Sequence, residues 1–174
     1  ARARWPALRQ CVDVLAAWAR SLGLQEALAT ADMALMACRG ARYHHDAAQY
    51  SRTAFCNLFL SDDKGLDVHF PAAGRRMGLA RGTAMLFDTG QPHAVIVRGD
   101  GGFDATRFMR DQDCTQVFLS WELPLDDERV AKALGVAFNV SPGAGLQVDA
   151  GQLQLDGAQV DVCPVSGRWC VVDG

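Results

Sequence analysis

The sequence has no long hydrophobic run and no excess of charge of either sign. Its longest apolar stretches, such as Thr83 to Phe87 and Ala94 to Val97, fall far short of the roughly 20 residues that a membrane-spanning helix needs. Lys and Arg total 17 and Asp and Glu total 20, so the net charge is -3. This balance gives no electrostatic footprint for nucleic acid or for an anionic membrane surface. We therefore expect neither a membrane nor a nucleic acid as a partner.

Several motifs that would identify a function are also missing. The six cysteines form no CxxC pair, which argues against a zinc ribbon or a thioredoxin-like redox site. Cys11, Cys38, Cys56 and Cys114 lie in apolar segments, where reduced thiols pack as small hydrophobic groups. The sequence contains neither Gly-x-Ser-x-Gly nor a Walker loop, which argues against a serine hydrolase and an NTPase. No signal peptide pattern is present, and together with the reduced thiols this predicts a cytoplasmic protein.

Length and composition are those of an ordinary folded protein. The chain has 174 residues, of which 49% are hydrophobic and 21% are charged, and one hydrophobic core is sufficient for this size. We expect a single domain over residues 1–174. Its three parts would be an N-terminal helical support over 1–32, a β core over 33–123, and a short helix with a C-terminal β extension over 124–174.

The pattern of apolar residues indicates mainly β structure with flanking helices. Between Trp5 and Leu22 they recur at steps of three and four, which predicts an amphipathic helix ending at Gly23; a second helical turn is expected around Gln25 to Ala29. Seven short runs then alternate with Gly, Pro, Asp and Ser clusters, which predicts antiparallel strands in a sandwich or barrel. These runs are Met33–Arg42, Thr53–Leu60, Leu66–Phe70, Arg75–Leu79, Thr83–Asp88, His93–Arg98 and Cys114–Leu123. A helix and a terminal meander are expected over Asp126–Leu134, Leu146–Val148, Gln152–Leu155, Gln159–Val162 and Trp169–Val172.

The four histidines provide the main indication of chemistry. His44 and Asp46 are two residues apart, so on an extended chain their side chains point to the same face. A second strand can bring His93 to them. Two imidazoles and one carboxylate form the facial triad that binds non-haem Fe(II) and leaves coordination positions open. His45 should face away from this site, and a packing or solvent-facing role is expected for His69.

The order of these elements resembles that of the 2-oxoglutarate and Fe(II)-dependent oxygenases. His-x-Asp follows a strand, and His93 comes after the strand Gly82-Thr83-Ala84-Met85-Leu86-Phe87-Asp88 and a short turn. The resemblance covers about Met33 to Leu123. It implies a double-stranded β-helix, which is a jelly-roll or cupin-like barrel. It also implies that His44, Asp46 and His93 are both the metal ligands and the catalytic residues.

The resemblance further implies a binding site for 2-oxoglutarate. Members of the family use an arginine, or sometimes a lysine, to bind the distal carboxylate of this co-substrate. The usual positions hold other residues here, so we expect Arg107, or failing that Arg110, to provide the guanidinium. Asn57 and Tyr43 are near enough in sequence to the first ligands to contact the co-substrate or support the site. Ascorbate would be a stimulant.

The function implied by the resemblance is oxidation of a substrate coupled to decarboxylation of 2-oxoglutarate to succinate. The substrate is a small molecule or a protein side chain, and the sequence does not determine which, nor does it determine the oligomeric state. Two alternatives remain. The irregular arginine spacing supports a cupin-like metal protein that does not use 2-oxoglutarate. The same barrel could also be a non-catalytic binding module.

Overall fold

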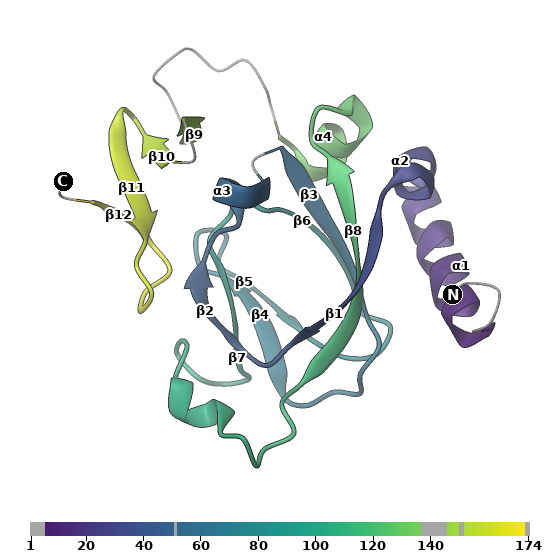
Figure 1. Ribbon diagram of the computed structural model, residues 1–174, viewed down its shortest axis with the longest axis horizontal. Helices are drawn as coiled ribbons and strands as arrows, with labels where there is room; N and C mark the ends of the chain where they lie inside the picture. Colours follow the sequence, from purple (N-terminus) through teal and green to yellow (C-terminus); the bar gives the residue numbers. More distant parts are fainter. Residues whose placement is uncertain (1–5, 51, 137–145, 150–151, 173–174) are drawn as a thin grey trace.

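The computed structural model describes residues 6–50, 52–136, 146–149 and 152–172 of the chain (Figure 1). The structure is mainly β, with short helices at its periphery. The helices are α1 (Pro6–Ser21), α2 (Gln25–Thr30), α3 (Ala47–Tyr50), the 3-10 helix η1 (Ala105–Phe108) and α4 (Glu128–Leu134). The strands are β1 (Met33–Cys38), β2 (Ala41–His44), β3 (Thr53–Phe59), β4 (Leu66–Phe70), β5 (Arg75–Gly78), β6 (Ala84–Asp88), β7 (His93–Val97), β8 (Gln116–Pro124), β9 (Leu146–Asp149), β10 (Gln152–Leu155), β11 (Ala158–Val162) and β12 (Trp169–Val171). None of the helices in these ranges is long and apolar enough to span a membrane.

The strands form three antiparallel sheets. Sheet A has the order β1-β8-β3-β6, sheet B has the order β2-β7-β4-β5, and sheet C has the order β12-β11-β10-β9. Sheets A and B face each other as a sandwich (Figure 1). The predicted mainly β architecture of antiparallel strands is confirmed. The described pairings all lie within single sheets, so they show packed sheets and no closed barrel.

The two faces of sheet A serve different cores because neighbouring residues on a strand point to opposite sides. On β3, Ala54, Cys56 and Leu58 pack toward the helices. Phe55 and Phe59, on the other face of the same strand, pack between sheets A and B. The interior of the sandwich is therefore strongly aromatic, and the helical face of the sheet has its own aliphatic core.

Helices α1 and α2 cover the outer face of sheet A (Figure 1). Leu8, Leu15 and Ala19 of α1 are buried, whereas Val14 is 66% exposed. This distribution is that of an amphipathic helix lying on a sheet. The helix ends before Gly23, which has a φ of +75°, and both N-terminal helices lie where the sequence pattern predicts them.

Sheet C covers the outer face of sheet B. Tyr43, Ala94 and Ile96 of sheet B form a buried cluster with Val162, and Trp169 packs against it. The predicted terminal meander is confirmed by the antiparallel pairing of β9 to β12. Strands β2 and β7 are thus packed on both faces, which fixes their position.

The predicted strand Met33–Arg42 is wrong in one respect. The chain leaves sheet A after Cys38 and enters sheet B at Ala41. At the corner Gly40 has a φ of +81°, a left-handed conformation that residues with a Cβ adopt at a cost. The short helix α3 was also not expected from the sequence.

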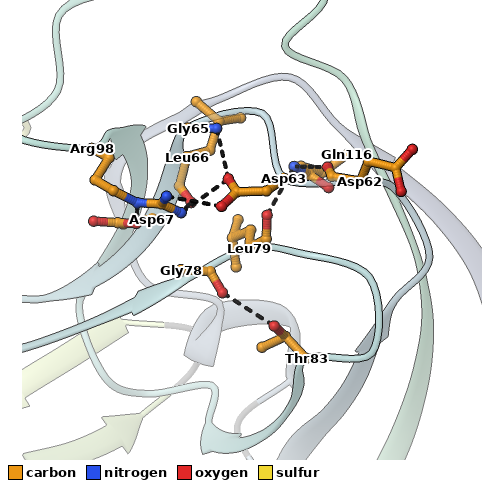
Figure 2. A network of polar contacts seen from close by, with 10 residues as sticks. All are labelled: Asp62, Asp63, Gly65, Leu66, Asp67, Gly78, Leu79, Thr83, Arg98 and Gln116. Atoms are coloured by element: carbon orange, nitrogen blue, oxygen red, sulfur yellow. Dashed lines mark hydrogen bonds and ion pairs between the residues drawn. The ribbon is translucent and has the colours of Figure 1, made fainter.

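A polar network lies at one end of sheet B, around Arg98 (Figure 2). Arg98 follows the last residue of β7, whereas His93 is the first, so the network is at the other end of this strand from His93. The Arg98 guanidinium donates to Asp67 Oδ1 at 2.8 Å and to the two Asp63 oxygens at 2.9 and 3.0 Å. Asp63 Oδ1 also accepts the Gly65 N–H at 2.8 Å. These bonds join the loop between β3 and β4 to the end of β7. The buried Asp67 carboxylate thereby has the cationic partner that its burial requires.

This network predicts a pH-dependent contribution to stability. The hydrogen bonds from Arg98 and Gly65 hold the pKa of Asp63 below its ordinary value. A carboxyl group whose pKa is lower in the folded state stabilises the fold above its unfolded pKa and loses that effect as the pH falls. We expect Asp63→Asn to lower the free energy of unfolding most above about pH 4, with a loss that shrinks at lower pH.

The measurement is urea unfolding of both proteins across the acidic range. Asp13→Asn, which replaces an exposed carboxylate on α1, is the matched control. The loss of unfolding free energy in Asp63→Asn could instead stay constant from neutral to strongly acidic pH. That result would show that the charge of Asp63 does not stabilise the fold through this network.

Candidate metal centre

His44, Asp46 and His93 come together at one end of the sandwich. His44 Nε2 lies 3.7 Å from Asp46 Oδ1, and His93 Nε2 lies 3.6 Å from Asp46 Oδ2. One candidate donor atom from each residue lies within 4.8 Å of the other two. Ligands bonded at 2.0–2.2 Å to one ion are about 3.0 to 3.6 Å apart. The three side chains therefore need only small movements to share a divalent cation.

Strand pairing makes the two histidines direct neighbours. His44 ends β2 and His93 begins β7, and the two residues are direct partners across this antiparallel pair. Their ring centroids are 4.4 Å apart. Asp46 lies beyond β2, where its carbonyl accepts the N–H groups of Gln49 and Tyr50 at the start of α3. The predicted convergence of these three residues is confirmed, but Asp46 reaches the cluster from a position just before a helix and not from an extended strand.

Both imidazoles are oriented by backbone carbonyl groups. His44 Nδ1 lies 2.7 Å from the carbonyl oxygen of Arg42, and His93 Nδ1 lies 2.9 Å from that of Gln91. A carbonyl oxygen only accepts, so each Nδ1 carries a proton, and it is Nε2 of each ring that lies toward Asp46. Metal-binding histidines are commonly held in this way. Burial lowers the pKa of His93, which favours the neutral form that a metal requires.

A buried threonine joins the segments that carry the ligands. Thr89 is fully buried, and its carbonyl oxygen accepts the Asp46 N–H at 2.9 Å. Its hydroxyl lies 2.7 Å from the Tyr50 carbonyl oxygen and 2.8 Å from that of Thr53. The turn before His93 is thus bound to the segment around Asp46. Sequence reasoning missed Thr89, because a threonine in a turn gives no signal of such contacts.

Two aromatic rings enclose the inner side of His93. The centroid of its ring is 5.1 Å from that of Phe87 and 5.9 Å from that of Phe70. These rings shield the His93 imidazole, and the residue is only 7% exposed. Sequence reasoning also missed this role, although the alternation of β4 and β6 places both rings inside the sandwich.

The three ligands open into a cavity of about 380 Å³ between sheets A and B. Its polar side chains, apart from the three ligands and the Cys38 thiol, are Tyr50, Asn57, Ser120 and Glu122. The remaining lining residues are Ala34, Met36, Ala37, Ala41, Phe55, Phe59, Val68, Leu79, Met85, Phe87, Val95 and Phe118. No lysine or arginine belongs to this lining. The cavity therefore suits an apolar molecule and offers no cationic side chain to a dicarboxylate.

The structure does not bring the two expected arginines to this cavity. Arg107 lies on η1, where its Nε is 3.3 Å from Asp100 Oδ2 and its side chain is 51% exposed. Arg110 is exposed on the following turn. The reason is that the chain after Arg98 leaves sheet B and forms an outer loop before β8 begins. Counting residues from His93 therefore does not locate an inward position on β8.

Asn57 and Tyr43 have opposite placements. Asn57 points into the cavity and is 4% exposed. Tyr43 lies on the other face of β2, beneath sheet C, where its hydroxyl is 2.6 Å from His69 Nδ1. Alternation along β2 explains this, since His44 faces inward. His45 faces away from the ligands as expected, with its Nε2 at 3.7 Å from Asp161 Oδ1.

The chain was also compared with known proteins. No protein-family model and no curated protein sequence matches it. Among solved structures it is similar to the polyketide cyclase RemF from Streptomyces resistomycificus, with 18% identity, a TM-score of 0.31, and coverage of 52% of this chain and 54% of RemF. It is also similar to vicilin from Corylus avellana (hazelnut), with 17% identity, a TM-score of 0.30, and coverage of 59% of this chain and 32% of vicilin. The chain thus spans about half the length of RemF and a third of that of vicilin.

Proposed function

We propose that this chain is a metal-dependent enzyme that holds one divalent ion, Fe(II), between His44, Asp46 and His93. The observation that supports the proposal is the arrangement of the two imidazoles. Each places Nε2 within 3.7 Å of an Asp46 oxygen while its Nδ1 is held by a backbone carbonyl. Two histidines and one carboxylate that leave open positions are the donor set of non-haem iron oxygenases.

The strand order of the sandwich supports the same proposal. Sheets A and B contain eight strands in the orders β1-β8-β3-β6 and β2-β7-β4-β5, which is consistent with the double-sheet jelly roll of cupin-like proteins. We propose that the fold is of this double-stranded β-helix type. In it the ligands lie at one end, beside a cavity whose walls are mainly apolar.

The chemistry that Fe(II) supplies when bound at such a triad is activation of dioxygen for oxidation of a neighbouring molecule. The chain's own residues have three tasks. Arg42 and Gln91 orient the imidazoles through their carbonyl groups. Phe70 and Phe87 shield His93. The apolar cavity holds the substrate against the open side of the site, so a small apolar molecule is the substrate class that we propose.

Dependence on 2-oxoglutarate is the second candidate. The order His-x-Asp and distal His on this strand arrangement favours it. The lining of the cavity, which has no lysine or arginine and includes the Glu122 carboxylate, gives no partner for the distal carboxylate of this co-substrate. We therefore favour an oxidation that does not use 2-oxoglutarate.

An anaerobic titration with Fe(II) tests the proposal, with bound metal quantified after gel filtration. We expect one Fe(II) per chain, and a chain that binds no Fe(II) would instead support a non-catalytic binding module.

The loaded protein is then exposed to air with 2-oxoglutarate and ascorbate. Formation of succinate would select the second candidate, whereas bound iron without succinate would select the first.

A further inference from the structure

One polar side chain of the cavity has no partner in the fold. Asn57 lies on β3, faces the space between the sheets and is 4% exposed. Its Oδ1 is buried and makes no hydrogen bond with any described residue. Burial of a carbonyl oxygen without a donor lowers stability. Asn57 lines the cavity beside the candidate metal centre, and its buried, unpaired oxygen calls for a donor that the described residues do not provide.

The surroundings of Asn57 explain why its oxygen stays unpaired. Met85 is its direct neighbour on β6, and a thioether donates no hydrogen bond. Ser120 is its direct neighbour on β8, and the structure shows no hydrogen bond from the Ser120 hydroxyl to Oδ1. Phe55 and Phe59, two residues away along β3, complete an apolar rim. The donor must come from a molecule inside the cavity.

We infer that the cavity binds a neutral, largely apolar molecule of about the size of a substituted aromatic ring, which carries a hydroxyl or amino group that donates a hydrogen bond to Asn57 Oδ1. The aromatic lining matches the body of such a molecule. The volume of about 380 Å³ is at the small end of ligand pockets. The inference rests on the proposed function only for the claim that this molecule is the substrate. The binding of the molecule to Asn57 involves no metal and can be tested separately.

The test compares three probes that share one ring. Phenol has a hydroxyl donor, whereas anisole and toluene have none. Binding to the full chain is measured by NMR titration in the presence of EDTA, so that no metal can hold the phenol oxygen. In the native protein we expect phenol to bind at least about fivefold more tightly than anisole, the effect of one net hydrogen bond.

Asn57→Leu should remove this preference. Its phenol and anisole affinities should become similar, while toluene should bind as well as before. Met85→Leu changes an apolar residue of the same cavity and should keep the native preference. Equal affinities of phenol and anisole in the native protein, or an unchanged preference in Asn57→Leu, would overturn the inference.

Thermal unfolding gives an independent readout. Replacing an unpaired buried amide with an apolar side chain of similar shape removes a cost of folding, so Asn57→Leu should raise Tm. A lower Tm would show that the amide has a structural partner, and this would also overturn the inference. The probe titrations contain EDTA and the Fe(II) titration contains no probe. Failure of the proposed function and failure of this inference are therefore distinguishable.

Discussion

Asp46→Ala is expected to lower the affinity of the chain for Fe(II) by more than about 100-fold, which is the upper limit for loss of a residue that only supports a metal ligand. Asp46 is the one carboxylate of the cluster, and its two oxygens face the two histidines separately, at 3.7 and 3.6 Å. Without it, two neutral imidazoles would remain, with no negative charge to balance the cation. Anaerobic titration with Fe(II) measures the loss.

The matched control is Asp161→Ala. Asp161 also faces a histidine, with Oδ1 at 3.7 Å from His45 Nε2, but this pair lies on the far side of β2 from the candidate metal centre. The control should bind Fe(II) as the native protein does. Asp46→Ala should still fold, because the backbone hydrogen bonds of residue 46 do not use the side chain. Native-like Fe(II) affinity in a folded Asp46→Ala protein would exclude this triad as the metal site.

The candidate ligands could be predicted because their geometry depends on local chain properties. His44 and Asp46 are close in sequence, and the antiparallel pairing of β2 with β7, in the register that places His44 opposite His93, brings the site together. The expected convergence is found even though Asp46 stands just before α3 and not on an extended strand. The carboxylate of Asp46 still lies on the side of His44, with Oδ1 at 3.7 Å from His44 Nε2, so the error in local structure did not change the outcome.

The co-substrate anchor could not be predicted in the same way. Its position was inferred by counting from His93, which assumes that the chain continues directly into the next strand of the sandwich. The chain instead forms an outer loop with η1, where Arg107 pairs with Asp100. The inward residues of β8 that reach the cavity are Phe118, Ser120 and Glu122. Nothing in the loop sequence shows that it turns outward.

The corner between β1 and β2 was missed for a related reason. The run from Met33 to Arg42 has the composition of one strand, and a single glycine within a strand is compatible with several local structures. In the structure Gly40 adopts a left-handed conformation, and the chain passes from sheet A to sheet B there. This passage positions β2, and therefore His44, opposite β7. The site thus depends on a glycine that lies outside it.

Gly40→Val is accordingly expected to lower the free energy of unfolding by about 2 to 5 kcal/mol, combining the left-handed backbone with a steric clash. A Cβ at this position would lie 2.5 Å from the Phe108 ring. Gly74 also has a positive φ, but a Cβ there meets no atom within 4 Å. Gly74→Val should therefore lose only the backbone part, about 1 to 2 kcal/mol.

Urea unfolding of both variants separates the two contributions to the loss. Adding Phe108→Ala to Gly40→Val should recover part of the loss, because the clash is with that ring. Equal losses in Gly40→Val and Gly74→Val, or no recovery in the double variant, would show that the ring does not restrict the corner. Weaker Fe(II) binding by folded Gly40→Val would show in addition that the corner sets the position of His44. In that case the change of sheet at Gly40 is what brings a residue of the first predicted strand to the candidate metal centre.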